Sequence, residues 1–144
     1  RPSWRVERRL TAMSRGLNDS SSQILRGEIY YIYDGNNAHG CEQQGGRPGI
    51  VVSNNINNRY STTVEVVYCT TRQKRELPTH VMISSLRMPS TALCEQVTTV
   101  SVSRLGRYVG RCTYGEMRKI EDAILVSLGL SHLVSNQQPE GMYA

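Results

Sequence analysis

Residues 40–54 read GCEQQGGRPGIVVSN and join a loop rich in glycine and polar residues to an apolar run. Gly45 and Gly46 allow a tight turn, because glycine adopts backbone angles that other residues avoid. Pro48 biases the preceding Arg47 towards an extended conformation. We therefore expect the guanidinium of Arg47 to be held at the edge of a sheet, at the mouth of a buried strand over 48–54.

Outward from this stretch, alternating or β-branched runs separated by polar turns predict further strands. The expected strands are 27–33, 48–54, 63–70, 79–84 and 91–97, with shorter ones at 100–105 and 107–113. Loops are expected at 34–46, 55–62 and 71–76, where turn-forming or basic residues cluster.

One helix is predicted, near the C-terminal end. Thr113 and Glu116 have the spacing of a capping box, and Gly129 can end the helix. The apolar residues between them recur at helical spacing, at Met117, Ile120, Ile124 and Leu128. Short strands followed by one helix predict a mainly β fold with a C-terminal helix (α+β), in which the helix packs on a small antiparallel barrel.

The charge of the chain is unevenly distributed. Residues 1–26 hold six arginines against Glu7 and Asp19, which accounts for most of the formal net charge of +5. We expect residues 1–25 to be a basic, disordered extension, in which Met13 could be a native start, 26–133 to be the folded domain and 134–144 to be a frayed tail. A basic extension favours nucleic acid or an acidic protein as partner, with a solvated leader as the simpler alternative.

Several classes of protein are disfavoured. No apolar run is long enough for a membrane span, and the N-terminal segment lacks the apolar region of a signal peptide, so a cytoplasmic protein is expected. The four cysteines are irregularly spaced, at Cys41, Cys69, Cys94 and Cys112, which predicts buried free thiols. No nucleotide-binding or metalloprotease motif is present, and His39, His80 and His132 lack metal-ligand spacing, so no metal or cofactor is expected.

Polar residues at strand and loop junctions are the remaining candidates for a site, because loops on a rigid sheet often carry function. They are Glu42, Arg47, Ser53, Asn54, Thr70, Thr71, His80, Glu95 and Gln96. A guanidinium is always charged and its fork matches phosphate oxygens, so Arg47 predicts a site for an anion or for developing negative charge. The alternative is a salt bridge between Arg47 and Glu42 that pins the loop.

These segments, in this order, resemble the MazF/PemK (Kid) family of toxin endoribonucleases over about residues 26–130. The resemblance is carried by E-Q-x-G-x-R-P at 42–48, by L-P-T-H at 77–80 and by the E-Q pair at 95–96. It implies an SH3-like antiparallel barrel, CcdB/MazF/PemK-like, that works as a homodimer. It also implies sequence-specific, metal-independent cleavage of single-stranded RNA, and an antitoxin whose acidic segment blocks the site.

The resemblance also implies roles for individual residues. The family's catalytic pair falls on Arg47 and Thr70, which would stabilise charge on the phosphoryl oxygens while the ribose 2′-OH attacks phosphorus. The products would be a 2′,3′-cyclic phosphate and a 5′-OH. Glu42 would be the base or would orient Arg47. RNA contacts are expected from Ser53, Asn54, Tyr60, Thr71, Arg72, Lys74, Arg75, His80 and Gln96.

The sequence departs from the family pattern in front of Glu42. Cys41 stands where some relatives have histidine, and His39 lies two residues earlier, so a catalytic histidine is not expected there.

Two other functions fit the same fold. CcdB-like proteins poison DNA gyrase without cutting RNA, but the presence of both Arg47 and Thr70 argues against this reading. A non-enzymatic SH3-like module would need an aromatic groove for proline-rich ligands. The single tryptophan, Trp4, lies in the N-terminal extension and there is no phenylalanine, although eight tyrosines keep this alternative open.

Overall fold

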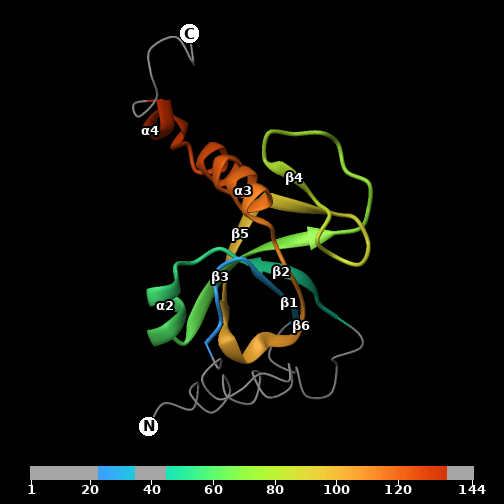
Figure 1. Ribbon diagram of the computed structural model, residues 1–144, viewed down its shortest axis with the longest axis vertical. Helices are drawn as coiled ribbons and strands as arrows, with labels where there is room; N and C mark the ends of the chain where they lie inside the picture. The colour runs from blue at the N-terminus through green and yellow to red at the C-terminus, as the bar shows by residue number, and fades with distance from the viewer. Residues whose placement is uncertain (1–22, 35–44, 136–144) are drawn as a thin grey trace.

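The computed structural model describes residues 23–34 and 45–135 of the 144-residue chain. Six strands of this part form one antiparallel sheet in the order β4-β5-β3-β2-β1-β6 (Figure 1). The strands are β1 (Glu28–Ile32), β2 (Arg47–Val51), β3 (Thr63–Thr70), β4 (His80–Ile83), β5 (Ser90–Ser101) and β6 (Leu105–Arg111). The helices are α2 (Asn55–Tyr60), α3 (Tyr114–Ser127) and α4 (Ser131–Ser135), and a 3₁₀ turn, η2, spans Val102–Arg104.

The sheet buries a core on each of its faces, because side chains alternate along a strand. One core packs the sheet against α3 and includes Ile29, Ile50, Val67, Met117, Ile120 and Ala123. The core on the other face includes Ile24, Tyr30, Ile32, Val51, Val66, Tyr68 and Leu105. A six-stranded, barrel-like antiparallel sheet with a C-terminal helix confirms the predicted fold class.

Two predictions of local structure are wrong. Residues 55–62, expected to form a loop, contain α2, because the side chain of Asn54 accepts a hydrogen bond from the Asn57 N–H and caps a helix there. Residues 91–97 and 100–105 were expected to be separate strands, but 91–97 and 100–101 belong to the one strand β5, while Val102–Arg104 form η2 and Leu105 begins β6. β5 continues to Ser101 because its first part pairs with β4 and nearly its whole length pairs with β3.

The predicted helix is present and its capping box is formed. The Thr113 hydroxyl accepts from the Glu116 N–H, and the Glu116 carboxylate accepts from the Thr113 N–H. Gly129 follows the helix with φ of 74° and ends it as expected. The apolar stripe is buried only in its first part, since Leu128 is 57% exposed.

The folded unit begins earlier than residue 26. Ile24 is fully buried in the core, and the Gln23 side chain donates a hydrogen bond to the carbonyl of Asn55. The expectations for most of the N-terminal extension and for the tail fall on 1–22 and 136–144, outside the described residues. Within the described part, no helix is both long enough and apolar enough to cross a membrane.

Three of the cysteines are free and buried, as predicted, and Cys41 lies outside the described residues. Burial is the main cause that raises the pKa of Cys94 and of Cys112 to about 12. Burial also raises the pKa of Cys69. All three thiols are therefore protonated at neutral pH and serve as core side chains.

Candidate active site

The turn before Arg47 is built around a glycine that no other residue could replace without strain. Gly46 has φ of 109°, and a Cβ at this position would lie 2.2 Å from the carbonyl oxygen of Ile32. The Gly46 N–H donates to the Asp34 carboxylate at 3.0 Å, and the Tyr31 hydroxyl donates to the Gly46 carbonyl at 3.1 Å. These contacts fix the backbone from which the side chain of Arg47 extends.

Arg47 is exposed at the first position of β2, and its guanidinium stacks on an aromatic ring. The guanidinium carbon lies 4.2 Å from the ring centre of Tyr68, which is itself only 6% exposed and anchored in the core. This cation–π contact orients the side chain. None of the ion pairs between described residues involves Arg47.

The pairing of β2 with β3 brings Thr70 to the same place. Gly49 pairs with Tyr68 in this antiparallel ladder, so continuing the register by two residues sets Arg47 opposite Thr70. Residues directly opposite each other point to the same face of a sheet, here the face away from α3. The Thr70 hydroxyl oxygen accepts a hydrogen bond from the Arg72 N–H at 3.2 Å, which leaves the hydroxyl proton available for a ligand.

The segment that follows Thr70 presents several of the predicted RNA contacts. Thr71, Arg72, Lys74 and Arg75 are all exposed between β3 and β4. The structure therefore connects the Arg47–Thr70 pair directly to a basic surface segment. Glu42, the third predicted catalytic residue, lies outside the described residues.

His80, one of the predicted RNA contacts, holds this basic segment in place. Its side chain is 9% exposed, with Nδ1 2.7 Å from the carbonyl oxygen of Arg75 and Nε2 3.2 Å from the Glu95 carboxylate. Burial raises the pKa of Glu95, but hydrogen bonds from its own backbone N–H, from His80 and from Thr79 outweigh this, and the net pKa is lowered. A charged carboxylate therefore anchors His80.

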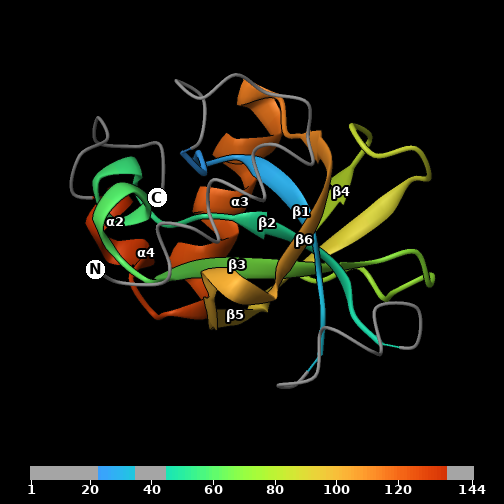
Figure 2. The same cartoon turned by 90° about the horizontal axis from the view of Figure 1, so that it is seen from below.

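Three other predicted RNA contacts are not near Arg47. Ser53, Asn54 and Tyr60 belong to the α2 end of β2 and β3, about 17 Å along a five-residue strand from Arg47. Figures 1 and 2 both show α2 and β4 at opposite ends of the sheet. Asn54 is engaged as the cap of α2, whereas Tyr60 is 63% exposed.

Ser53, another of the predicted RNA contacts, supports the fold. It is 5% exposed, its hydroxyl donates to the side-chain oxygen of the buried Asn58, and the Glu65 N–H donates to it. Gln96, by contrast, is exposed on β5.

The sequence interpretation missed the residues that position Arg47. Tyr68 could have been found, because it lies two residues before Thr70 and therefore on the same face of the strand. Tyr31 and Asp34 gave no local signal, since their role depends on the turn packing against β1. Among the residues that the structure describes, no three His, Cys, Asp or Glu side chains are grouped so that they could hold a metal ion.

Comparison with known sequences extends these observations. Residues 25–128 match the family described as PemK-like, MazF-like toxin of type II toxin–antitoxin system. The chain is 37% identical over 112 residues to Endoribonuclease EndoA of Bacillus subtilis (strain 168), which covers 74% of this chain and 96% of that protein.

Solved structures with the same fold include toxins bound to antitoxins. An endoribonuclease in complex with its cognate antitoxin from a mycobacterial species matches with a TM-score of 0.64 and 31% identity, over 74% of this chain and 96% of that chain. A MazE–MazF crystal structure from Deinococcus radiodurans (Form-II) shares the fold at 16% identity, with a TM-score of 0.61, over 76% of this chain and 98% of that chain.

Proposed function

Because this chain belongs to the family of PemK-like, MazF-like toxins of type II toxin–antitoxin systems, we propose that Arg47 and Thr70 are its catalytic residues and that it cuts single-stranded RNA at specific sequences without a metal ion. The chain is the toxin endoribonuclease of such a system, as its family and its 37% identity to EndoA indicate.

The observation that carries the proposal is the juxtaposition of Arg47 and Thr70 on one face of the sheet. In the proposed step the 2′-oxygen of a ribose forms a bond to the adjacent phosphorus while the bond to the 5′-oxygen breaks. Negative charge builds on the non-bridging oxygens, where the Arg47 guanidinium and the Thr70 hydroxyl would donate hydrogen bonds. Fixed donors of this kind stabilise the transition state more than the ground state.

The proton of the 2′-OH must leave and the 5′-oxygen must gain one. A guanidinium releases its proton reluctantly, so we assign Arg47 an electrostatic role and not that of a base. Glu42 remains the proposed base, or the group that orients Arg47.

The exposed residues after Thr70 would bind the RNA backbone. Arg72, Lys74 and Arg75 supply three cations beside the proposed catalytic pair, and such contacts weaken as salt is added. Thr71 and Gln96 are exposed polar groups for base edges or ribose. Asn54 and Tyr60 would be reached only by an RNA extended along the sheet.

We also propose a cytoplasmic homodimer that is inhibited by an antitoxin. Antitoxin complexes among the similar structures support such a partner for this chain. An apolar groove of about 450 Å³, lined in part by Val52, Val97, Ile124, Leu125 and Leu128, supports association with a second copy. Leu128→Glu should lower the molar mass measured by light scattering from dimer towards monomer, while an unchanged mass would argue against this surface.

A defined long RNA, incubated with the purified protein in EDTA, tests the function. Discrete cuts that leave a 2′,3′-cyclic phosphate and a 5′-OH, and that are absent with Arg47→Ala/Thr70→Ala, would support the proposal. Intact RNA at high protein concentration would contradict it. In that event, trapping of gyrase–DNA complexes would test the alternative of a gyrase poison.

A further inference from the structure

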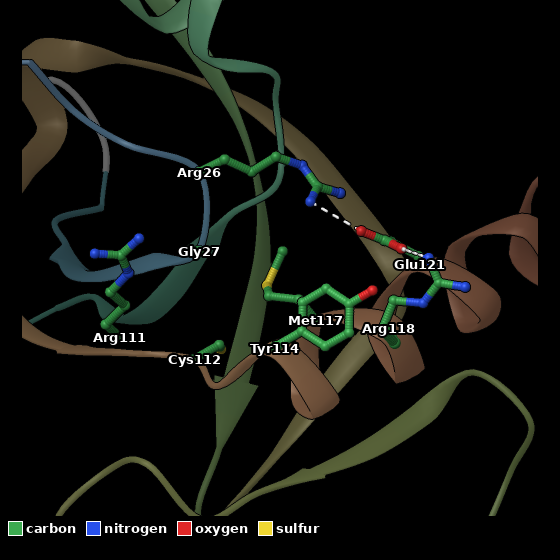
Figure 3. Close-up of a pocket in the computed structure, with 8 residues that line it drawn as sticks. All are labelled: Arg26, Gly27, Arg111, Cys112, Tyr114, Met117, Arg118 and Glu121. Atoms are coloured by element: carbon green, nitrogen blue, oxygen red, sulfur yellow. Dashed lines mark hydrogen bonds and ion pairs between the residues drawn. The ribbon is translucent and has the colours of Figure 1, made fainter.

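A basic cavity lies at the end of the sheet where α3 begins, away from the Arg47–Thr70 pair. It has a volume of about 310 Å³ and is lined by Arg26, Gly27, Arg111, Cys112, Tyr114, Met117, Arg118 and Glu121 (Figure 3). The sequence pattern did not single out this set, because its members come from two distant stretches of the chain, 26–27 and 111–121. The main-chain bond from the Cys112 N–H to the Gly27 carbonyl, at 2.9 Å, joins the two stretches.

The charges around the cavity do not balance. Glu121 is shared by two guanidiniums, at 2.9 Å from Arg26 and 3.7 Å from Arg118. Arg111 is exposed and forms no ion pair within the part of the chain that the structure describes. The lining of the cavity therefore holds three cations and one carboxylate, which favours an anionic ligand.

The same cavity also carries an exposed aromatic ring. Tyr114 is 79% exposed, and the guanidinium carbon of Arg118 lies 6.0 Å from its ring centre. Figure 3 shows this ring between Arg111 and Arg118, beside the side chain of Met117. Guanidiniums for phosphates and an exposed ring for stacking are the combination that binds unstacked nucleotides, whereas an acidic peptide would need only the charges.

We propose that this cavity is an accessory binding site for single-stranded RNA, which takes a phosphodiester between Arg111 and Arg118 and stacks a base on Tyr114. This inference rests on the proposed function, since it assigns a second contact to the same substrate. Arg47 pairs with Ile32 at one end of β1, while Arg26 and Gly27 precede the other end. About 17 Å of strand separates the two sites, so only an extended RNA can occupy both.

Binding of a long fluorescein-labelled 2′-O-methyl oligouridine tests the proposal, because this probe lacks the 2′-OH that cleavage would need. Arg111→Ala/Arg118→Ala should weaken its binding on the order of tenfold and reduce the salt dependence by about 0.7 in log–log slope for each phosphate that is no longer neutralised. Tyr114→Ala should weaken binding by a similar factor at unchanged salt dependence. Arg107→Ala, on the same strand as Arg111 but outside the cavity, is the matched control and should bind as wild type.

Cleavage assays separate this proposal from the proposed function. With an RNA cut by the wild-type protein, the cavity variants should raise KM for the long RNA and leave kcat unchanged, and they should not affect a short RNA that spans only the cleavage site. Arg47→Ala should abolish cleavage of both RNAs while the cavity still binds the probe. Unchanged probe binding by the cavity variants would mean that the cavity does not bind RNA. If the variants lost binding only to poly-glutamate, the cavity would instead be a site for an acidic protein.

Discussion

An arginine lies near each end of β1, and the contacts that position the two arginines differ. Arg26, before the strand, donates to the carbonyl of Val52 at 3.0 Å and to Glu121 at 2.9 Å. Arg47, opposite the last residue of the strand, rests on the ring of Tyr68 without a carboxylate among the described residues. An arginine bound by acceptors is largely committed to the fold, whereas one held by an aromatic face keeps its donors for a ligand.

Removal of the Arg47 side chain should have the largest effect, on the rate of RNA cleavage. Arg47→Ala is expected to lower the rate of RNA cleavage by about 10²–10³, the usual cost of losing one donor to a developing oxyanion. Thermal unfolding should be nearly unchanged, because the side chain is exposed. Single-turnover cleavage and a melting curve measure the two effects. A loss of stability without a loss of cleavage rate in Arg47→Ala would contradict the contrast drawn between Arg47 and Arg26.

The free energy of unfolding should depend on pH through Glu116, in the first turn of α3. Partial burial raises the pKa of Glu116, but hydrogen bonds from the Ser85 hydroxyl and from the N–H groups of Thr113, Ser84 and Ser85 outweigh it, and the net pKa is lowered. A lowered pKa adds stability that is present above the unfolded value of about 4.3 and is lost as pH falls through the folded value.

Glu116→Gln should therefore cost about 1–3 kcal/mol in the free energy of unfolding at neutral pH, because the half-buried Ser85 hydroxyl and three N–H groups lose a charged acceptor. The difference from wild type should shrink below about pH 4. Urea unfolding at both pH values measures this, with Asp122→Asn at an exposed position of the same helix as control. A difference that is independent of pH would show that the carboxylate charge is not what holds α3 there.

Removal of the aromatic ring on which Arg47 stacks should have a smaller effect on the rate of cleavage. Tyr68→Leu removes the cation–π contact and should lower cleavage by about two- to fivefold, the equivalent of about 0.5–1 kcal/mol. Tyr68→Phe keeps the ring and should retain the wild-type rate. Equal rates for the two variants, in single-turnover assays of the folded fraction, would mean that the ring does not position the arginine.

Removal of the carboxylate of Glu121, which binds Arg26 at the other end of β1, should have the smallest effect. Arg26 and Glu121 are both 32% exposed at their side chains, and ion pairs of that exposure contribute about 0.2–1 kcal/mol. Glu121→Gln should therefore lower the free energy of unfolding by no more than this, and added salt should reduce the difference. Chemical denaturation at low and high salt checks it, and a large, salt-independent loss would mark the pair as a buried element of the core.

The sequence predicted those features that depend on neighbours along the chain. Strand alternation located β1 and β3, and the capping box of Thr113 and Glu116 located α3. The same logic missed α2, although the bond from the Asn57 N–H to the Asn54 side chain that caps it is local, because asparagine is also common in loops.

The residues of the candidate site could be proposed from the sequence, whereas the contacts that arrange them could not. Arg47 was singled out from its neighbours in the sequence and was paired with Thr70 by the family resemblance, but the ring that supports Arg47 and the turn that positions it depend on contacts across strands. Ser53 and His80 are polar and near the motifs, yet both satisfy their hydrogen bonds internally. Polarity in a sequence does not distinguish a side chain that binds a ligand from one that holds a loop.

Chemical rescue of Arg47→Ala by free guanidinium ion tests the central claim most directly. If the Arg47 side chain only supplies a guanidinium to the scissile phosphate, millimolar guanidinium should restore part of the cleavage rate. The rate should exceed the one measured with sodium chloride at the same ionic strength. Guanidinium should not rescue Thr70→Val, which lacks a hydroxyl. Full activity of Arg47→Ala without any addition would contradict the account, because the charge at the phosphate would then be stabilised by another group.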